Sequence, residues 1–269
     1  MEFIDSHAHL TDPAFDADRT ELISQRILQA HVVKSVEIGC APNEWEGTLA
    51  LAEKFPAIVV PVIGVHPEYA PQFLPNQVPV FQQFLTKPQV AAVGEIGLDY
   101  TCLEIASQKD QTTLFEQMIT LADRAHKPLV LHVRRNDETY GVYDDTFSIL
   151  RQTWKQNTTR PFSGVLHCFC ARYEEAKKAL DMGLLLGING CFTYKKNEYI
   201  REAIRKVGAD KIILETDCPY LSPQGKRGTR NDPSNIPLIA QYVADYLNIP
   251  LEDLAQKTTQ QTKLLYGLN

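Results

Sequence analysis

Short apolar segments rich in Val, Ile and Leu recur along this chain and alternate with longer segments of helical periodicity. The apolar segments cover residues 3–4, 32–38, 58–65, 90–93, 129–133, 164–166, 184–188 and 211–214. Strands that read as nearly continuous apolar runs are typical of a parallel sheet with helices on its faces. The alternation therefore predicts an α/β fold.

The segments between these strands carry apolar side chains at helical spacing. In residues 112–125, for example, Leu114, Met118 and Leu121 fall on one face. We expect further helices at 17–30, 45–55, 80–85, 145–154, 173–182 and 198–207, and additional C-terminal helices at 236–247 and 251–265. Eight strand–helix units in about 250 residues predict a (β/α)8 TIM barrel, a single domain over residues 1–269. A doubly wound open sheet is the alternative that periodicity alone leaves open.

The charge balance limits what the chain can bind. It has 27 Lys and Arg against 33 Asp and Glu, a formal charge of −6. Proteins that coat nucleic acid need basic side chains to neutralise phosphates, so that class of protein is excluded. Any attraction of nucleic acid must be local to a cleft or come from bound metal ions.

No apolar stretch approaches the roughly 18 residues of a membrane span, and no signal peptide is evident. The six scattered cysteines suggest reduced thiols. We therefore expect a cytoplasmic protein with no membrane attachment and no obligate protein partner.

Histidines and carboxylates occur where the apolar segments end. They are His7, His9, Glu95, His132, His167 and Asp217, from five different predicted strands. In a barrel these strand ends converge on one mouth, which is where active sites of this fold are built. Imidazole and carboxylate ligands together suit Zn, Mn, Fe or Co, and carboxylate-rich positions also accept Mg. Because six ligands exceed what one catalytic ion needs, the pattern predicts two divalent ions, roughly 3.5 to 4 Å apart, that share a carboxylate.

Motifs from one end of the chain to the other resemble those of the TatD-type metal-dependent deoxyribonucleases, a family of amidohydrolase-like barrels. The motifs, in the order in which the family has them, are FIDSHAH at 3–9, GVHP at 64–67, VGEIGLDY at 93–100, PLVLHVR at 128–134, LHCF at 166–169 and LETDCPYL at 214–221. The resemblance implies a (β/α)8 fold, a two-metal centre and hydrolysis of phosphodiester bonds in DNA, with single strands shortened from the 3′ end.

The resemblance also implies a role for each matched residue. His7, His9 and Asp217 would bind one metal ion, His132 and His167 would bind the other, and Glu95 would bridge the two. Glu95 and Asp217 would be catalytic, because water shared by the ions would lose its proton to Asp217 and attack phosphorus as hydroxide. A covalent route through Cys168 is disfavoured, since its side chain should point away from that of His167 on a strand.

Three basic residues near the predicted mouth are candidates for binding the substrate. His66 follows the third strand and could donate a hydrogen bond to a phosphate oxygen. Arg134 shares the strand face of His132 and offers a planar fork for phosphate. Arg227 lies in the basic segment 222–231 directly behind the last strand. Each also has a structural interpretation, as a rim histidine or as part of a solvated loop.

The stretch 135–145 is longer than the family pattern and adds four acidic residues near the mouth. Negative charge there would repel a long polyanion.

The leading hypothesis is a deoxyribonuclease that acts on single-stranded DNA ends with Mg, Mn or Zn. The acidic stretch keeps open a metal-dependent esterase or amidase, such as a D-aminoacyl-tRNA deacylase. A barrel that only binds a partner is disfavoured, since it would have no use for six converging ligands.

Overall fold

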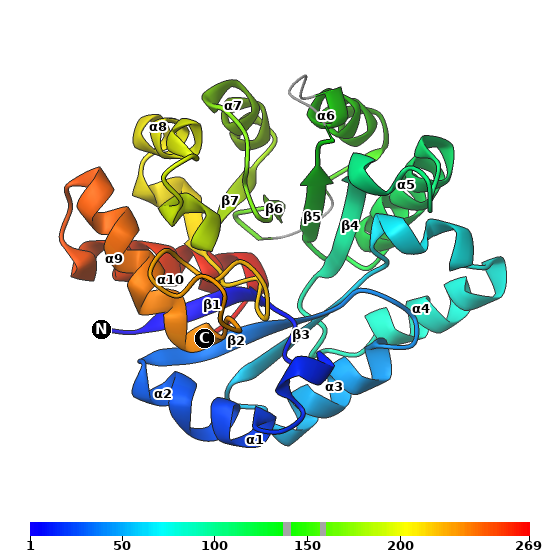
Figure 1. Cartoon of the computed structure of the whole chain (residues 1–269). Helices are drawn as coiled ribbons and strands as arrows, with labels where there is room; N and C mark the ends of the chain where they lie inside the picture. Colours follow the sequence, from blue (N-terminus) through cyan, green and yellow to red (C-terminus); the bar gives the residue numbers. More distant parts are fainter. Residues whose placement is uncertain (137–140, 157–159) are drawn as a thin grey trace.

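A computed structural model describes residues 1–136, 141–156 and 160–269. Eight parallel strands follow one another around a barrel in the order of the sequence, with helices between them (Figure 1). The strands are β1 Phe3–Ala8, β2 Val32–Gly39, β3 Val59–Ile63, β4 Val93–Asp99, β5 Leu129–Arg134, β6 Gly164–Leu166, β7 Leu184–Ile188 and β8 Ile212–Leu214. This arrangement confirms the predicted (β/α)8 barrel.

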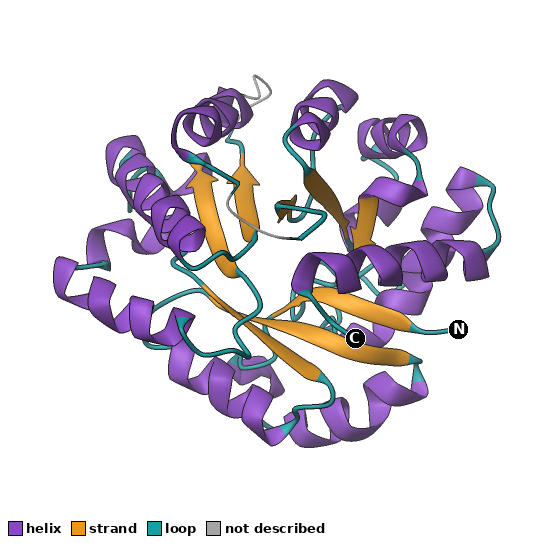
Figure 2. Cartoon of the chain, turned by 180° about the vertical axis from the view of Figure 1, so that it is seen from behind, coloured by secondary structure: helices purple, strands orange, loops and turns teal. Residues whose placement is uncertain are grey.

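The helices form an outer ring around the strands (Figure 2). The longer ones are α3 Trp45–Lys54, α4 Val78–Leu85, α5 Gln108–Arg124, α6 Gly141–Thr153, α7 Tyr173–Asp181, α8 Glu198–Val207, α9 Ile236–Leu247 and α10 Leu251–Tyr266. The short helices are η1 Pro13–Phe15, α1 Arg19–Glu21, η2 Leu22–Arg26, α2 Ile27–Gln29, η3 Pro67–Gln72, η4 Pro75–Gln77, η5 Tyr100–Cys102, η6 Gly190–Thr193, η7 Ala209–Lys211 and η8 Pro233–Asn235. The additional C-terminal helices α9 and α10 are present as predicted, and α10 packs against β1 and β8. No helix in the described parts of the chain is both long enough and apolar enough to cross a membrane.

The first and last strands meet through a short seam rather than a full ladder. Ala8 pairs with Cys218 in a single parallel bridge, and the backbone N–H of Asp217 donates to the carbonyl of His7 at 2.9 Å. Below this bridge, the buried side chain of Asp5 accepts from the backbone N–H of Thr216 at 2.9 Å and from its hydroxyl. The side chain of Asp5 thus replaces part of the strand ladder, and these contacts hold the ends of β1 and β8 side by side.

Apolar side chains fill the barrel and the space beneath the helices. One buried cluster takes alternate residues from six strands, which places those residues on one face of each strand. It includes Val36, Val60, Val130, Val165, Leu185 and Ile213. A larger cluster joins the other strand faces to the helices. The barrel interior is therefore a packed core, and polar side chains that point inward collect near the mouth.

Two predicted boundaries are wrong near the site. The fourth strand was expected to begin with the apolar segment 90–93 and to end at Glu95, but β4 begins at Val93 and continues past Glu95 to Asp99. The pairing of β4 with β5 shifts register between Val93 and Ile96, which places Glu95 at the irregularity. Just beyond the irregularity, Gly97 lets β4 approach β5 closely, since a Cβ on Gly97 would lie 2.0 Å from the carbonyl oxygen of His132.

The acidic stretch 135–145 is also different from the expected loop. Helix α6 begins at Gly141 rather than at 145, because Val142 already packs into the core. Two of the four acids therefore lie on a helix: Asp144 pairs with Lys178 at 2.7 Å, and Asp145 accepts a hydrogen bond from Tyr100. The other two acids, at 137 and 138, lie outside the described residues. Repulsion of a polyanion by this stretch thus has less support than the sequence suggested.

The predicted helix at 17–30 is interrupted. Residues 19–29 form α1, one wide π-helical segment and α2 in succession. Leu22, Ile23 and Ile27 remain buried through this change in winding. The segment therefore covers the barrel as an ordinary helix would.

Candidate metal centre

The six residues singled out by the sequence lie together at the mouth of the barrel. Three belong to strands: His7 is in β1, Glu95 in β4 and His132 in β5. His9 and His167 directly follow β1 and β6, and Asp217 lies three residues after the end of β8. All six are buried or partly buried. Residues up to 210 positions apart in the chain, His7 and Asp217, therefore face a common space.

Glu95 lies between two groups of histidines. Its Oε2 is 3.3 Å from Nε2 of His7. Its Oε1 contacts Nδ1 of His132 and lies 3.4 Å from Nε2 of His167. Each carboxylate oxygen thus faces a different set of ring nitrogens, which is the geometry that a bridging ligand requires.

Asp217 completes the side of the site formed by β1. Its Oδ1 lies 3.3 Å from Nε2 of His9, 3.8 Å from Nε2 of His7 and 4.0 Å from Nε2 of His167. Asp217 has a left-handed backbone with a φ of 57°, which Asp tolerates better than most residues. That turn directs the carboxylate toward the histidines after β8 has ended.

Two further carboxylates hold histidine rings from behind. Nε2 of His132 lies 3.2 Å from Oδ2 of Asp99, and Nδ1 of His167 lies 3.0 Å from Oε1 of Glu215. Gly187 leaves room for Glu215, because a Cβ at this position would lie 2.2 Å from its Oε2. Such contacts fix the orientation of an imidazole and the nitrogen that it presents to a ligand.

Two residues near the site were not recognised as such in the sequence. Cys40, directly after β2, places its Sγ 3.6 Å from Oε2 of Glu95. Burial raises the pKa of Cys40 to about 12, so its thiol is neutral at physiological pH. Glu37 accepts hydrogen bonds from the backbone of Leu10 and Thr11, which anchors the segment after His9. The carboxyl end of β2 was the available signal for Cys40, whereas Glu37 lies within an apolar segment.

The charges in the site are strongly coupled. Burial opposes ionisation of Glu95, but His167 and His132 outweigh it and hold the pKa of Glu95 well below its usual value. Burial also opposes the charge on His132, yet Glu95 and Asp99 raise the pKa of His132 to about 9. Likewise, Glu215 and Glu95 overcome burial and raise the pKa of His167. The carboxylates thus create a field that favours cations.

His7 provides a test of whether a metal ion fits this site. Burial, reinforced by the charge on His167, lowers the pKa of His7, so its imidazole is neutral. Among the described residues, neither buried ring nitrogen makes a hydrogen bond of good geometry, although Nε2 faces Oε2 of Glu95 at 3.3 Å. A buried polar atom of this kind is costly unless another partner satisfies it. A cation near Glu95 would take the lone pair of Nε2, so the donor set fits Zn, Mn, Fe or Co.

His66 lies beside the six residues. Its ring is 4.3 Å from that of His132 between centroids. Burial and the charge on His132 lower the pKa of His66 to about 3, so the ring is neutral. The backbone N–H of Glu68 donates to Nδ1 of His66 at 3.3 Å. In a neutral imidazole that accepts at Nδ1, the hydrogen is on Nε2, so His66 has a donor available.

The two arginines are placed differently. Arg134 is exposed at the end of β5, two residues beyond His132. Arg227 is exposed on the loop after β8, where its guanidinium lies 4.7 Å from the ring centroid of Tyr194. Among the described contacts, Arg227 meets Tyr194 rather than any of the six residues. Arg230, from the same loop, pairs with Asp18 at 2.6 Å and is structural.

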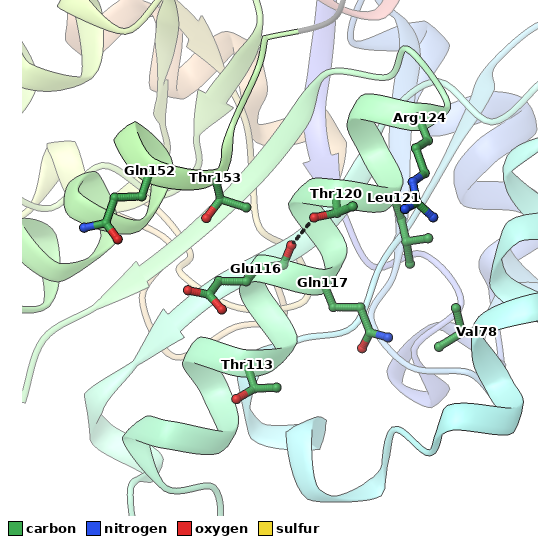
Figure 3. A pocket seen from close by; sticks show the side chains of 9 residues that line it. All are labelled: Val78, Thr113, Glu116, Gln117, Thr120, Leu121, Arg124, Gln152 and Thr153. Carbon is green, nitrogen blue, oxygen red and sulfur yellow. Dashed lines mark hydrogen bonds between the residues drawn. The ribbon is translucent and has the colours of Figure 1, made fainter.

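A polar hollow of about 640 Å³ lies on the outer helices, away from the six residues. It is lined by Val78 of α4, by residues of α5 including Glu116 and Arg124, and by Gln152 and Thr153 of α6 (Figure 3). The hydroxyl of Thr120 donates to the carbonyl of Glu116, within one turn of α5. None of the candidate site residues lines this hollow, so we do not associate it with the chemistry at the mouth.

A (β/α)8 barrel that gathers histidines and carboxylates at its mouth has the architecture of a metal-dependent hydrolase. Comparison with known proteins supports the same class of enzyme. The family model described as "TatD related DNase" matches residues 4–267. The chain therefore belongs to the TatD-related DNase family, and it is a metal-dependent hydrolase of this type.

Individual relatives match over almost their whole length. The uncharacterized metal-dependent hydrolase YabD of Bacillus subtilis is 30% identical over 266 residues, which are 98% of this chain and 99% of the relative. The 3'-5' ssDNA/RNA exonuclease TatD of Pantoea ananatis is 30% identical over 269 residues, with 98% and 99% covered. The crystal structure of YjjV, a TatD homolog from Escherichia coli K12, superposes with a TM-score of 0.88 at 27% identity, covering 99% of this chain and 98% of that one.

Proposed function

We propose that this protein uses two divalent metal ions to hydrolyse phosphodiester bonds at the ends of single-stranded DNA. The observation that carries the proposal is the position of Glu95, whose two oxygens face two different groups of histidines. A single-ion site would have no need for a carboxylate shared in this way. The family to which the chain belongs supports the same chemistry.

These contacts support a ligand set for each ion. We assign His7, His9 and Asp217 to one ion and His132 and His167 to the other, with Glu95 between them. When bound, divalent ions lower the pKa of water and neutralise charge that develops on a phosphoryl group. Mg, Mn and Zn are all compatible with these ligands.

Asp217 is the residue that we assign as proton acceptor. Burial would raise its pKa, but the hydrogen bond with His9 and the charge on His167 lower it, so Asp217 is ionised. Its Oδ1 faces the histidines, which leaves Oδ2 to take the proton from the attacking water. His9 is in turn held by the carbonyl of Ile38, 3.3 Å from its Nδ1.

The substrate contacts are proposed from charge and position. His66 can donate from Nε2 to a phosphate oxygen beside His132. Arg134 can bind a second phosphate oxygen at the exposed end of β5. Arg227, stacked on Tyr194, is assigned to the backbone of a longer strand further from the reacting bond. The proposal of single-stranded nucleic acid as substrate draws on the name of the Pantoea relative.

The experiment that tests this function uses protein stripped of metal and reloaded separately with Mg, Mn and Zn. A 5′-labelled single-stranded DNA, the matching RNA and a panel of acyl esters and amides, including an aminoacyl-tRNA, serve as substrates. We expect metal-dependent shortening of the DNA one nucleotide at a time from its 3′ end. Hydrolysis of the acyl substrates with the DNA left intact would overturn the proposal and indicate an esterase or amidase.

Metal loading is expected to strengthen as the pH rises. The pKa of His132 is raised to about 9, so without metal this side chain holds a proton at neutral pH. A metal ion binds the neutral imidazole and must displace that proton, so affinity falls as the pH is lowered. Titration of Mn into the metal-free protein at several pH values would measure this trend and the protons released. An affinity that is the same across this pH range would contradict it.

A further inference from the structure

Three thiols meet at the ends of two neighbouring strands. Cys168 and Cys170 follow β6, and Cys191 lies in η6 after β7. The Sγ atoms of Cys168 and Cys170 are 4.0 Å apart, and all three Sγ atoms lie within 4.8 Å of one another. All six cysteines of the chain are free, and these three are partly exposed. The sequence did not indicate this cluster, because Cys191 is separated from the other two in the chain.

The 4.0 Å between the sulfurs of Cys168 and Cys170 matches two ligands of one metal ion. Sulfur ligands lie about 2.3 Å from zinc, which puts neighbouring sulfurs about 3.8 to 4.0 Å apart in tetrahedral or trigonal geometry. Sulfurs joined in a disulfide are only about 2.0 Å apart. Thiolates select soft ions such as zinc and monovalent copper, whereas Mg and Mn prefer oxygen. The cluster thus differs in ligand chemistry from the histidines and carboxylates nearby.

The backbone around these thiols is held in place. The N–H of Cys168 donates to Oε1 of Glu215 at 2.7 Å. The N–H of Cys191 donates to the side chain of Asn189 at 3.0 Å, and Asn189 in turn donates to Oε1 of Glu215 at 3.2 Å. Both cysteine-bearing turns are therefore tied to the same buried carboxylate. Ligands fixed in this way need little reorganisation to bind an ion.

We propose that Cys168, Cys170 and Cys191 bind one thiophilic metal ion, zinc or monovalent copper, at a site separate from the histidine–carboxylate centre. The ion replaces the thiol protons, which are released to solvent. The ion links the segment after the C-terminal end of β6 to the segment after the C-terminal end of β7. It therefore fixes the position of the residues after His167 relative to the neighbouring strand. This site does not depend on which bond the enzyme hydrolyses.

The test uses reduced, full-length protein whose main centre is saturated with Mg. Cadmium is titrated as the probe, because cadmium–thiolate bonds give ultraviolet charge-transfer absorption that oxygen and nitrogen ligands do not give. We expect one equivalent to bind with this absorption and three thiols to become protected from a thiol reagent. Parallel titrations with zinc and with monovalent copper under anaerobic conditions, followed by metal analysis, distinguish the two ions.

Variants assign the signal to these residues. Loss of even an outer-shell partner costs about tenfold or more in metal affinity, so Cys191→Ser and Cys170→Ser are each expected to weaken cadmium binding at least about tenfold. Cys102→Ser, which alters a thiol after β4, is expected to retain it. Because Cys40 lies beside Glu95, the relevant signal is the difference between the wild type and Cys191→Ser. The proposal is overturned if that difference is absent, if no thiolate absorption forms, or if the cysteines only close a disulfide.

Discussion

Replacing Glu95 with Gln is expected to lower kcat/KM for DNA hydrolysis by about a thousandfold. A bridging carboxylate positions both ions, and such ions contribute several kcal/mol to transition-state stabilisation. Since 1.36 kcal/mol corresponds to a tenfold change in rate, a loss of about 4 kcal/mol gives this factor. The side chains differ little in size, so the barrel should fold normally. The measurement is kcat/KM at saturating metal, together with metal content.

Glu116→Gln is the matched control. Glu116 lies on α5 in the outer hollow shown in Figure 3, where the same change should leave the rate unaffected. Unlike this control, the variant Glu95→Ala should bind less than the full metal complement. If Glu95→Gln kept a rate within tenfold of the wild type, Glu95 would not be a shared ligand.

Asp217→Asn is expected to reduce kcat by about 10²- to 10⁴-fold, the usual contribution of a general base. The amide retains the shape of the side chain but cannot accept a proton from water at Oδ2. The change also removes the negative charge that faces His9 at 3.3 Å. Single-turnover rates over a range of pH would show whether the basic group that Asp217 supplies has been lost.

Asp181→Asn is the corresponding control, because Asp181 is exposed on α7 and pairs with Lys177. Its rate should match that of the wild type. A fully active Asp217→Asn enzyme would mean that another group accepts the proton. Retention of metal with loss of kcat would separate the role of Asp217 as base from its role as ligand.

Much of this fold could be predicted because its strands are buried on both faces. Segments such as 184–188 read as continuous apolar runs, and their alternation with helices leaves few topologies. The error at β4 has a physical cause, since that strand carries Gly94 and Glu95 where the pairing shifts register. Helix α6 was predicted to start at 145, but Val142 and Tyr143 are already buried on it.

The residues at the mouth of the barrel could be predicted for a related reason. Parallel strands deliver the residues at their carboxyl ends to one place, so His132 and Asp217 could be placed together without any contact information. The contacts of Cys191 and Glu37 could not, since neither lies at a strand end that carries a histidine or carboxylate motif. The contacts of Arg227 could not be predicted from the sequence either, because a basic loop has no periodicity that fixes where its side chains point. Its stacking on Tyr194 follows only from the tertiary structure.

The central claim is that six side chains from across the chain hold a pair of metal ions, and crystals of the enzyme loaded with manganese test it most directly. Anomalous scattering locates manganese independently of the protein atoms. The account predicts two peaks, one beside His7, His9 and Asp217 and one beside His132 and His167, with Glu95 in contact with both. A single peak that Glu95 does not touch, or manganese bound only elsewhere on the barrel, would contradict it.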